Sequence, residues 1–297
     1  MATVGGYIHR ACDKGEKAVL IQDPVIVVTC GAGYIGSHMV KMLVSTGYRV
    51  VVIDDLSSGF EWAVQGAEFI CGSIGDKDLL RHCFASFDVA AVIHFAGMIS
   101  VSESAQRPDL YYTSNVVNSL TLVDEMLKNQ INKLIFSSTA AIFGNPTELP
   151  VHEDCEKNPI NPYGRSKLMV EQILADYDLA FALRSVSLRY FNAAGADPTG
   201  ALGECHEPET HLIPLVLQVA SGRRQSIAIF GDRYPTDDGT CVRDYIHVED
   251  LCSAHMLALK YLLNDGQSAS YNLGNGNGFS VREVVAAAEH VSGCRIR

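Results

Sequence analysis

The sequence lacks the features of several classes of protein. It has few basic residues, 23 lysines and arginines against 34 aspartates and glutamates, which gives a net charge of −11. Nucleic-acid binding usually requires a basic face, so we expect no nucleic-acid partner, although a local site can still bind small anions. No uncharged apolar run has transmembrane length, and residues 1–23 have no basic start followed by an apolar stretch. We therefore expect a soluble cytoplasmic protein.

Paired cysteine motifs are also absent. The nine cysteines are scattered and include no C-x-x-C pair, so neither a zinc knuckle nor a disulfide framework is predicted, and a reducing cytoplasm is the simplest setting. His94 ends an apolar run and is predicted to be a hydrogen-bonded core residue. The remaining histidines lack metal-ligand spacing, so we expect no metal site.

Short apolar, β-branched runs alternate with helical patterns along the first two thirds of the chain. They occupy residues 24–29, 49–53, 89–96, 133–138 and 185–191. Each run is apolar throughout, which is typical of strands buried on both faces of a parallel sheet. The strand–helix alternation predicts an α/β fold with a Rossmann-like, doubly wound parallel sheet.

The amino-acid composition changes after residue 192, where long segments rich in Gly, Pro and Asp predict loops. Such loops in a compact domain are usually functional. We predict an N-terminal extension at 1–23, a dinucleotide-binding domain at 24–192, and a smaller substrate lobe at 193–297 with later segments returning to the main sheet. Further helices are expected at 212–221, 248–264 and 280–292.

The stretch VTCGAGYIGSH at residues 28–38 joins the first predicted strand to the first predicted helix. Gly31, Gly33 and Gly36 fit the pattern G-x-G-x-x-G, in which glycines let the backbone approach a pyrophosphate at a helix N-terminus. The next strand ends at Asp54, and an acid there accepts hydrogen bonds from the adenosine ribose. The combination predicts a dinucleotide site that favours NAD over NADP.

A second motif, NPYGRSK, contains Tyr163 and Lys167 at the start of a helical pattern. Residues i and i+4 share a helix face, so we expect the ammonium of Lys167 to lie near the phenol and lower its pKa. Upstream, Thr139 lies at the end of a predicted parallel strand, where such sheets bind ligands and a hydroxyl can contact a substrate oxygen. Together with the glycine turn, this pair is predicted to be catalytic.

These motifs and several further stretches resemble one family. The chain is similar to extended short-chain dehydrogenases/reductases, and within them to the UDP-glucose (UDP-galactose) 4-epimerases. The matching stretches also include VIHFAG, SLRYFNAAGADPTG, HLIPL, CVRDYIHVEDL and YNLGNGNGFSV, in family order. The resemblance implies reversible, NAD-dependent 4-epimerization of a UDP-hexose through a 4-keto intermediate, and a homodimer built from helices at 104–128 and 162–180.

The resemblance also implies roles for individual residues. Tyr163 is the general base, Lys167 tunes it and binds the nicotinamide ribose, and Thr139 orients the sugar 4-oxygen. The implied cofactor site comprises Gly31, Gly33, Tyr34, Ile35, Gly36, Asp54, Ser73, Ile74, Phe95, Ala96, Gly97, Asn115, Tyr163, Lys167 and Tyr190. The implied UDP-sugar site comprises Thr139, Tyr163, Asn192, Leu212 and Arg243. Arg243 could instead form an ion pair with a neighbouring aspartate, Asp244 or Asp250.

Three features depart from the family pattern. Cys30 replaces the first glycine of the turn, where positive φ would cost roughly 1–2 kcal/mol. Ser73 stands where the family commonly has an adenine-binding aspartate. Family members also continue beyond Arg297, through a segment with a second diphosphate-binding arginine.

Three further functions stay open at this point. A nucleotide-sugar dehydratase would need an acid pair after Thr139, where Ala140 and Ala141 stand. Epimerization of a UDP-pentose or of an N-acetylated sugar nucleotide is the second. The third is a non-catalytic homologue that binds NAD or a sugar nucleotide.

Overall fold

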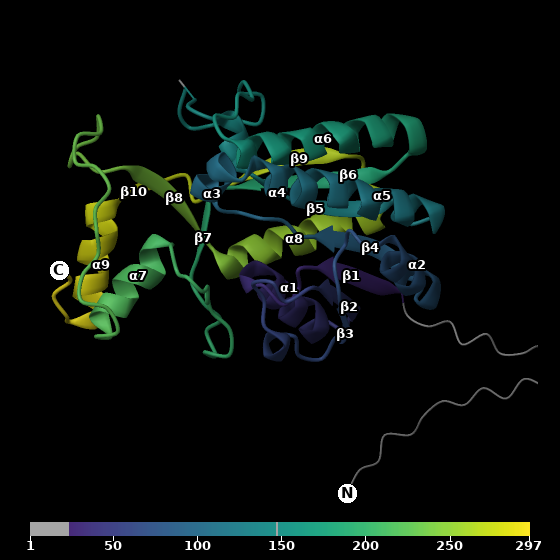
Figure 1. Cartoon of the computed structure of the whole chain (residues 1–297), viewed down its shortest axis with the longest axis horizontal. Helices are drawn as coiled ribbons and strands as arrows, with labels where there is room; N and C mark the ends of the chain where they lie inside the picture. The colour runs from purple at the N-terminus through teal and green to yellow at the C-terminus, as the bar shows by residue number, and fades with distance from the viewer. Residues whose placement is uncertain (1–23, 147) are drawn as a thin grey trace, which may run out of the picture.

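The computed structural model describes residues 24–146 and 148–297, so the predicted extension at 1–23 lies outside the described residues. Its main sheet has seven parallel strands in the order β3-β2-β1-β4-β5-β6-β9 (Figure 1). The strands are β1 (Val25–Thr29), β2 (Arg49–Asp54), β3 (Glu68–Cys71), β4 (Val89–His94), β5 (Lys133–Thr139), β6 (Arg184–Tyr190) and β9 (Ala269–Leu273). The predicted doubly wound sheet is confirmed.

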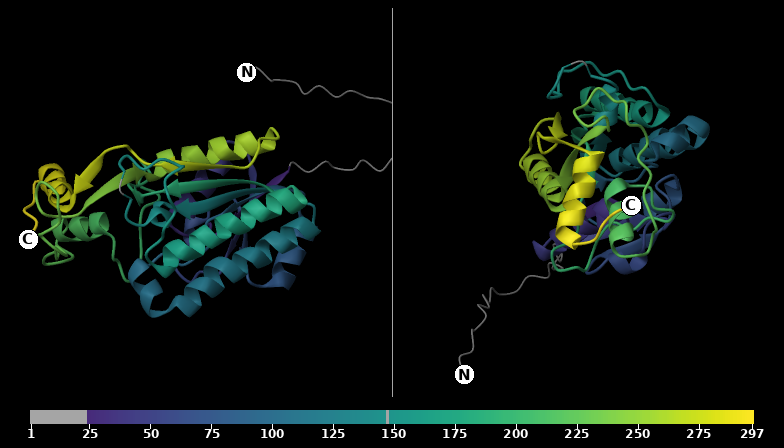
Figure 2. Two further views of the ribbon diagram at one scale, coloured as in Figure 1. Left: turned by 90° about the horizontal axis from the view of Figure 1, so that it is seen from above. Right: turned by 90° about the vertical axis from the view of Figure 1, so that its left-hand side faces the viewer.

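Helices cover both faces of this sheet, as the view from above in Figure 2 shows. α1 (Tyr34–Ser45) and α8 (Val248–Leu263) cover one face. α2 (Lys77–Ser86), α5 (Asn118–Lys128) and α6 (Pro162–Phe181) cover the opposite face. Successive side chains of β1 alternate between the two layers, with Ile26 and Val28 in one cluster and Val25 and Val27 in the second. Burial on both faces explains why the strand sequences are apolar throughout.

The helix expected at 104–128 is interrupted, which corrects that prediction. The chain forms α3 (Val101–Gln106), α4 (Pro108–Tyr111), a π-helical stretch at Tyr112–Val117, and then α5. Pro108 has no backbone N–H and fits only at the start of a helix, so a break occurs before it. The π-helical stretch carries Asn115, and such irregularities often occur at functional sites.

A second lobe extends beyond the carboxyl ends of the strands (Figure 1). It contains a small sheet in the order β10-β8-β7, with β7 (Asn192–Ala194), β8 (Val242–His247) and β10 (Gly278–Ser280). It also contains α7 (Leu212–Ala220) and α9 (Val281–Ser292), which pack together around Val216, Val219 and Ile296. Short 3₁₀ turns lie at Glu61–Ala63 and Ala140–Phe143.

Within the described ranges, no helix combines the length and apolar character needed to cross a membrane.

Candidate active site

The glycine turn between β1 and α1 has the close packing that a dinucleotide site requires. A Cβ at Gly36 would lie 2.1 Å from the carbonyl oxygen of Cys30, and one at Gly31 would lie 2.7 Å from a methyl of Val52. No side chain caps the first turn of α1, where Gly33 is the N-cap. The free N–H groups of this helix start can therefore bind a phosphate, and the turn fits a pyrophosphate.

Asp54, the last residue of β2, is hydrogen-bonded to the glycine turn. Its buried carboxylate accepts hydrogen bonds from the backbone N–H groups of Ala32 at 2.9 Å and Leu56 at 2.8 Å. Burial raises the pKa of Asp54, and the two backbone hydrogen bonds oppose this rise. Ser73 follows β3 and accepts a hydrogen bond from the backbone of Gly75, next to the buried Ile74.

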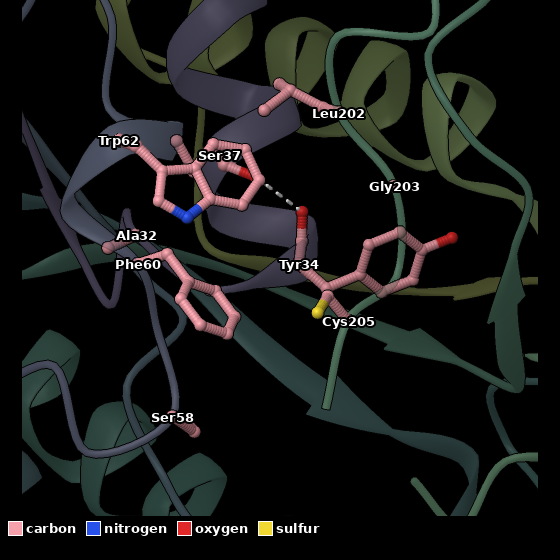
Figure 3. Close-up of a pocket in the computed structure, with 11 residues that line it drawn as sticks. Ala32, Tyr34, Ser37, Ser58, Phe60, Trp62, Leu202, Gly203 and Cys205 are labelled. Carbon is pink, nitrogen blue, oxygen red and sulfur yellow. Dashed lines mark hydrogen bonds between the residues drawn. The ribbon is translucent and has the colours of Figure 1, made fainter. Parts of the chain in front are cut away.

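Cys30 adopts a positive φ of 56°, the conformation in which its replacement of a glycine is costly. Its sulfur would lie 3.2 Å from a Cβ on Gly33, so the thiol lies over the turn. Burial, together with Asp54 and Asp55, raises the pKa of this thiol to about 12, which keeps it neutral at physiological pH. Figure 3 shows the narrow pocket beside the turn, where Phe60 and Trp62 face Tyr34 and the segment that contains Cys205.

Replacing Cys30 with glycine is expected to raise the free energy of unfolding by about 0.5–1 kcal/mol, because the backbone strain exceeds the entropic cost of a glycine. We also expect tighter NAD binding, since the thiol no longer crowds the turn. Cys30→Ala is the matched control, because it removes the sulfur and keeps the strain. Urea unfolding and NAD titration of the three proteins separate the two effects. Equal unfolding free energies for the glycine and alanine variants would contradict the role of strain.

Lys167 lies in the first turns of α6 and is fully enclosed. Its ammonium donates a hydrogen bond to the carbonyl of Ser137 at 2.9 Å and lies 5.0 Å from the ring centre of Phe136. Burial lowers the pKa of Lys167 to about 8. Gly97 comes close to this ammonium, because a Cβ there would lie 3.5 Å from it.

Tyr163 and Thr139 meet at the carboxyl end of β5. Burial raises the pKa of Tyr163, while a hydrogen bond with the Thr139 side chain lowers it in part. The expectation that Lys167 lowers this pKa is wrong, because the net effect is a rise in which burial is the largest cause. Thr139 itself accepts a hydrogen bond from the backbone N–H of Ala141.

Neighbouring strand ends complete this region. The hydroxyl of Tyr190, at the end of β6, lies 2.5 Å from that of Ser137. Asn115 is buried and its amide donates to the carbonyl of Met98 and the hydroxyl of Ser166. Phe95, Ala96 and Gly97 follow β4, at the same edge of the sheet as the glycine turn. The predicted cofactor residues therefore lie at the carboxyl end of the parallel strands and in the loops that follow them.

His94 confirms the prediction of a satisfied core histidine. It is fully buried, and its two ring nitrogens lie 2.8 Å from the hydroxyls of Thr29 and Ser119.

The residues predicted to bind the sugar nucleotide lie mainly in the second lobe. Asn192 in β7 donates to the carbonyl of Asp244, and Leu212 is the first residue of α7. Arg243 in β8 is exposed and donates to the carbonyl of Val242. Among residues 24–146 and 148–297, no ion pair joins Arg243 to Asp244 or Asp250, so the ion-pair interpretation of Arg243 is wrong.

A cavity of about 590 Å³ lies beside the small sheet, within the size range of ligand sites. It is lined by Ala194, Gly195, Tyr245, Ile246, His247, Asp250, Gly274, Asn275 and Phe279. The glycine-rich segment at 274–278 contributes two of these lining residues, Gly274 and Asn275.

The fold and the clustered strand-end groups define an extended short-chain dehydrogenase/reductase. The family model described as "NAD dependent epimerase/dehydratase family" matches residues 26–274. The chain belongs to this family.

Known relatives are similar over most of the chain. The UDP-glucose 4-epimerase of Halalkalibacterium halodurans is 50% identical over 90% of this chain and 80% of the relative. That of Azospirillum brasilense is 52% identical over 91% and 78%. A crystal structure of UDP-glucose 4-epimerase from Brucella ovis in complex with NAD is 47% identical, with a TM-score of 0.88 and coverage of 90% and 82%. One from Bifidobacterium longum with NAD+ and UDP is 38% identical, with a TM-score of 0.87 and coverage of 92% and 84%.

Proposed function

We propose that the protein catalyses the reversible, NAD-dependent 4-epimerization of a UDP-hexose, interconverting UDP-galactose and UDP-glucose. The observation that supports this most directly is the placement of Tyr163, Lys167 and Thr139 at the end of the sheet that carries the glycine turn, where Lys167 and Thr139 are buried and Tyr163 is half-buried. Relatives at about 50% identity bear the name of this activity. Two similar structures contain NAD. The close backbone packing at Gly31 and Gly36 of this chain is consistent with a pyrophosphate at the same turn.

In the proposed mechanism, Tyr163 as phenolate takes the proton from the sugar 4-hydroxyl and later returns it. Thr139 donates a hydrogen bond to the 4-oxygen and holds it beside Tyr163. When bound, NAD would accept a hydride from the sugar C4 and return it to the opposite face of the resulting 4-ketone, which inverts the configuration at C4. Lys167 would hold the nicotinamide ribose, and alignment of the sugar 4-hydroxyl between Thr139 and Tyr163 would favour proton transfer.

We assign the remaining predicted residues by their place in the fold. Gly31, Gly33 and Gly36 contact the pyrophosphate, and Asp54 the adenosine ribose. Ser73 and Ile74 flank the adenine, while Phe95 to Gly97, Asn115 and Tyr190 enclose the nicotinamide side. Asn192 and Leu212 contact the UDP moiety, and Arg243 pairs with its diphosphate, since a guanidinium binds phosphate oxygens in a bidentate fork.

Elimination of water is the main competing reaction, and the residues after Thr139 oppose it. Ala140 and Ala141 form a 3₁₀ turn there and offer no acid or base. A dehydratase would need a carboxyl pair at this place to remove water from the sugar. Epimerization needs only the proton acceptor that Tyr163 supplies.

The function is tested by incubating the purified protein with UDP-galactose and NAD. UDP-glucose is the expected product, while a 4-keto-6-deoxy sugar would indicate a dehydratase and no product a binding protein. Mass spectrometry of the nucleotide released on denaturation is expected to show NAD or NADH at about one per chain. Bound NAD without turnover would reject the epimerase and retain the cofactor site.

We also propose a cytoplasmic location. The eight cysteines within the described residues are all free, as expected in a reducing compartment.

A homodimer is proposed through α6 and the helical segments at 101–128. Apolar side chains are exposed there, including Leu179 at 88% and Val117 at 55%. We expect sedimentation to give a dimer that Leu179→Glu converts to monomer, because a charge in an apolar interface is left unpaired. Val291→Glu on α9 is the control, since Val291 is equally exposed on a different face. Dissociation by both variants, or by neither, would contradict this interface.

A further inference from the structure

Two histidines and two glutamates converge in the loop between β7 and α7, outside the proposed catalytic site. One potential ligand atom from each of Glu204, His206, Glu209 and His211 lies within 4.8 Å of the remaining three. The Nδ1 atom of His211 lies 3.0 Å from Glu204 and 2.9 Å from Glu209. That of His206 lies 3.5 Å and 3.7 Å from the same two carboxylates. Histidine spacing along the chain did not indicate this arrangement.

The distances suit a small divalent transition metal. Zinc binds imidazole nitrogen and carboxylate oxygen at about 2.0–2.2 Å, so neighbouring ligands of a tetrahedral ion lie roughly 3.3–3.5 Å apart. The His206 distances come close to this spacing, and the shorter His211 distances need a shift of a few tenths of an ångström. A set of imidazoles and carboxylates suits zinc and neighbouring first-row metals.

One of the four candidate ligand atoms has no hydrogen-bond partner within the loop. His206 Nδ1 is buried and has no hydrogen-bond partner, although it faces both carboxylates. The side chains of Glu204 and Glu209 are only 9% and 7% exposed, and no lysine or arginine of the described chain pairs with them. Glu209 accepts hydrogen bonds from the backbone N–H groups of Thr210 and His211, and a cation would further stabilise two buried negative charges. A protonated His211 provides one positive charge, yet it leaves His206 unsatisfied.

We propose that Glu204, His206, Glu209 and His211 bind one divalent transition metal ion of the zinc class. The ion satisfies His206 Nδ1, compensates both carboxylates, and fixes the loop at the start of α7, where Leu212 follows His211 directly. The loop also packs on the glycine turn, because the rings of His206 and Tyr34 meet edge to face and the Tyr34 hydroxyl donates a hydrogen bond to the carbonyl of Gly195. The metal thus holds the substrate lobe against the cofactor turn.

The test uses the full chain without a histidine tag, stripped with EDTA and then freed of it. Titration with Co²⁺ is expected to give the visible absorption of a tetrahedral site, saturating at one ion per chain and displaced by Zn²⁺. His206→Ala should lower Co²⁺ affinity at least tenfold. His290→Ala, which removes an exposed histidine on α9, should leave it unchanged. Zn²⁺ should raise the melting temperature of the parent protein and not that of His206→Ala.

A second variant covers the case in which His206→Ala fails to fold. Glu204→Gln keeps the shape of the side chain and removes its charge, and it should also lower Co²⁺ affinity at least tenfold. Binding without saturation, or equal affinities in the parent and both variants, would overturn the proposal. The titration reads neither cofactor content nor turnover, so loss of the metal site and failure of the proposed reaction are observed separately.

Discussion

Replacing Tyr163 with phenylalanine is expected to lower kcat about 10³-fold, because positioned acid–base groups typically contribute 10²- to 10⁴-fold. The ring and its packing stay, so the bound NAD content should not change. Because burial raises the pKa of Tyr163 and the phenolate is the reactive form, kcat/KM of the parent enzyme should rise with pH until Tyr163 is deprotonated. In the variant this rising limb should disappear.

The measurement is the initial rate of UDP-glucose formation across pH, with NAD content determined on the same samples. Tyr48→Phe is the matched control, because Tyr48 precedes β2 and lies at the amino end of the strands, opposite the end that carries Tyr163. It should retain the parent rate and pH profile. A rate within tenfold of the parent for Tyr163→Phe would show that a different group accepts the proton.

Replacing Gly36 with alanine is expected to weaken NAD binding about 100-fold, equivalent to about 2.8 kcal/mol. The added methyl would lie 2.1 Å from the Cys30 carbonyl, which is backbone and cannot rotate away. The turn must therefore move, and the N–H groups at the start of α1 lose their alignment with the pyrophosphate. Overpacking of this kind typically costs about 1–3 kcal/mol.

The control for this variant is the same change at Gly203. A methyl there has Ala196 Cβ at 3.7 Å as its nearest neighbour, and the position has no positive φ. Calorimetric NAD titration should give near-parent affinity for Gly203→Ala and weak binding for Gly36→Ala. Circular dichroism must first show that both variants fold. Unaltered NAD affinity in a folded Gly36→Ala would exclude this turn as the pyrophosphate site.

Much of the main sheet could be predicted, because its pattern is local. The strand at 24–29 is apolar in every position after Pro24 up to Thr29, and the turn after it carries glycines at places where a Cβ has no room. By contrast, β3 carries exposed Glu68 and Cys71 at its ends, so this edge strand lacked the signal of a buried strand. The small sheet consists of strands of three to six residues whose pairing depends on distant segments.

The candidate site likewise has residues that could be predicted from the sequence and properties that could not. Thr139, Tyr163 and Lys167 were predictable from motifs beside a strand end, and a helix fixes the spacing of the last two. The pKa of Tyr163 was not predictable, because it depends on burial that only the folded chain creates. The group formed by Glu204, His206, Glu209 and His211 lies on a loop without regular periodicity, so residue spacing could not indicate which side chains meet.

The return of β9 to the main sheet ties the two parts of the molecule together. β9 pairs with β6 in parallel, although some eighty residues separate them, and α8 supplies Cys252, Met256 and Leu259 to the core. The chain therefore passes between sheet and lobe at three places, after β6, before α8 and after β9. A fragment ending at residue 192 would expose the sheet face that α8 covers and leave β6 as an unprotected edge. The two parts are not interchangeable modules, and the lobe cannot swing freely as if on a single hinge.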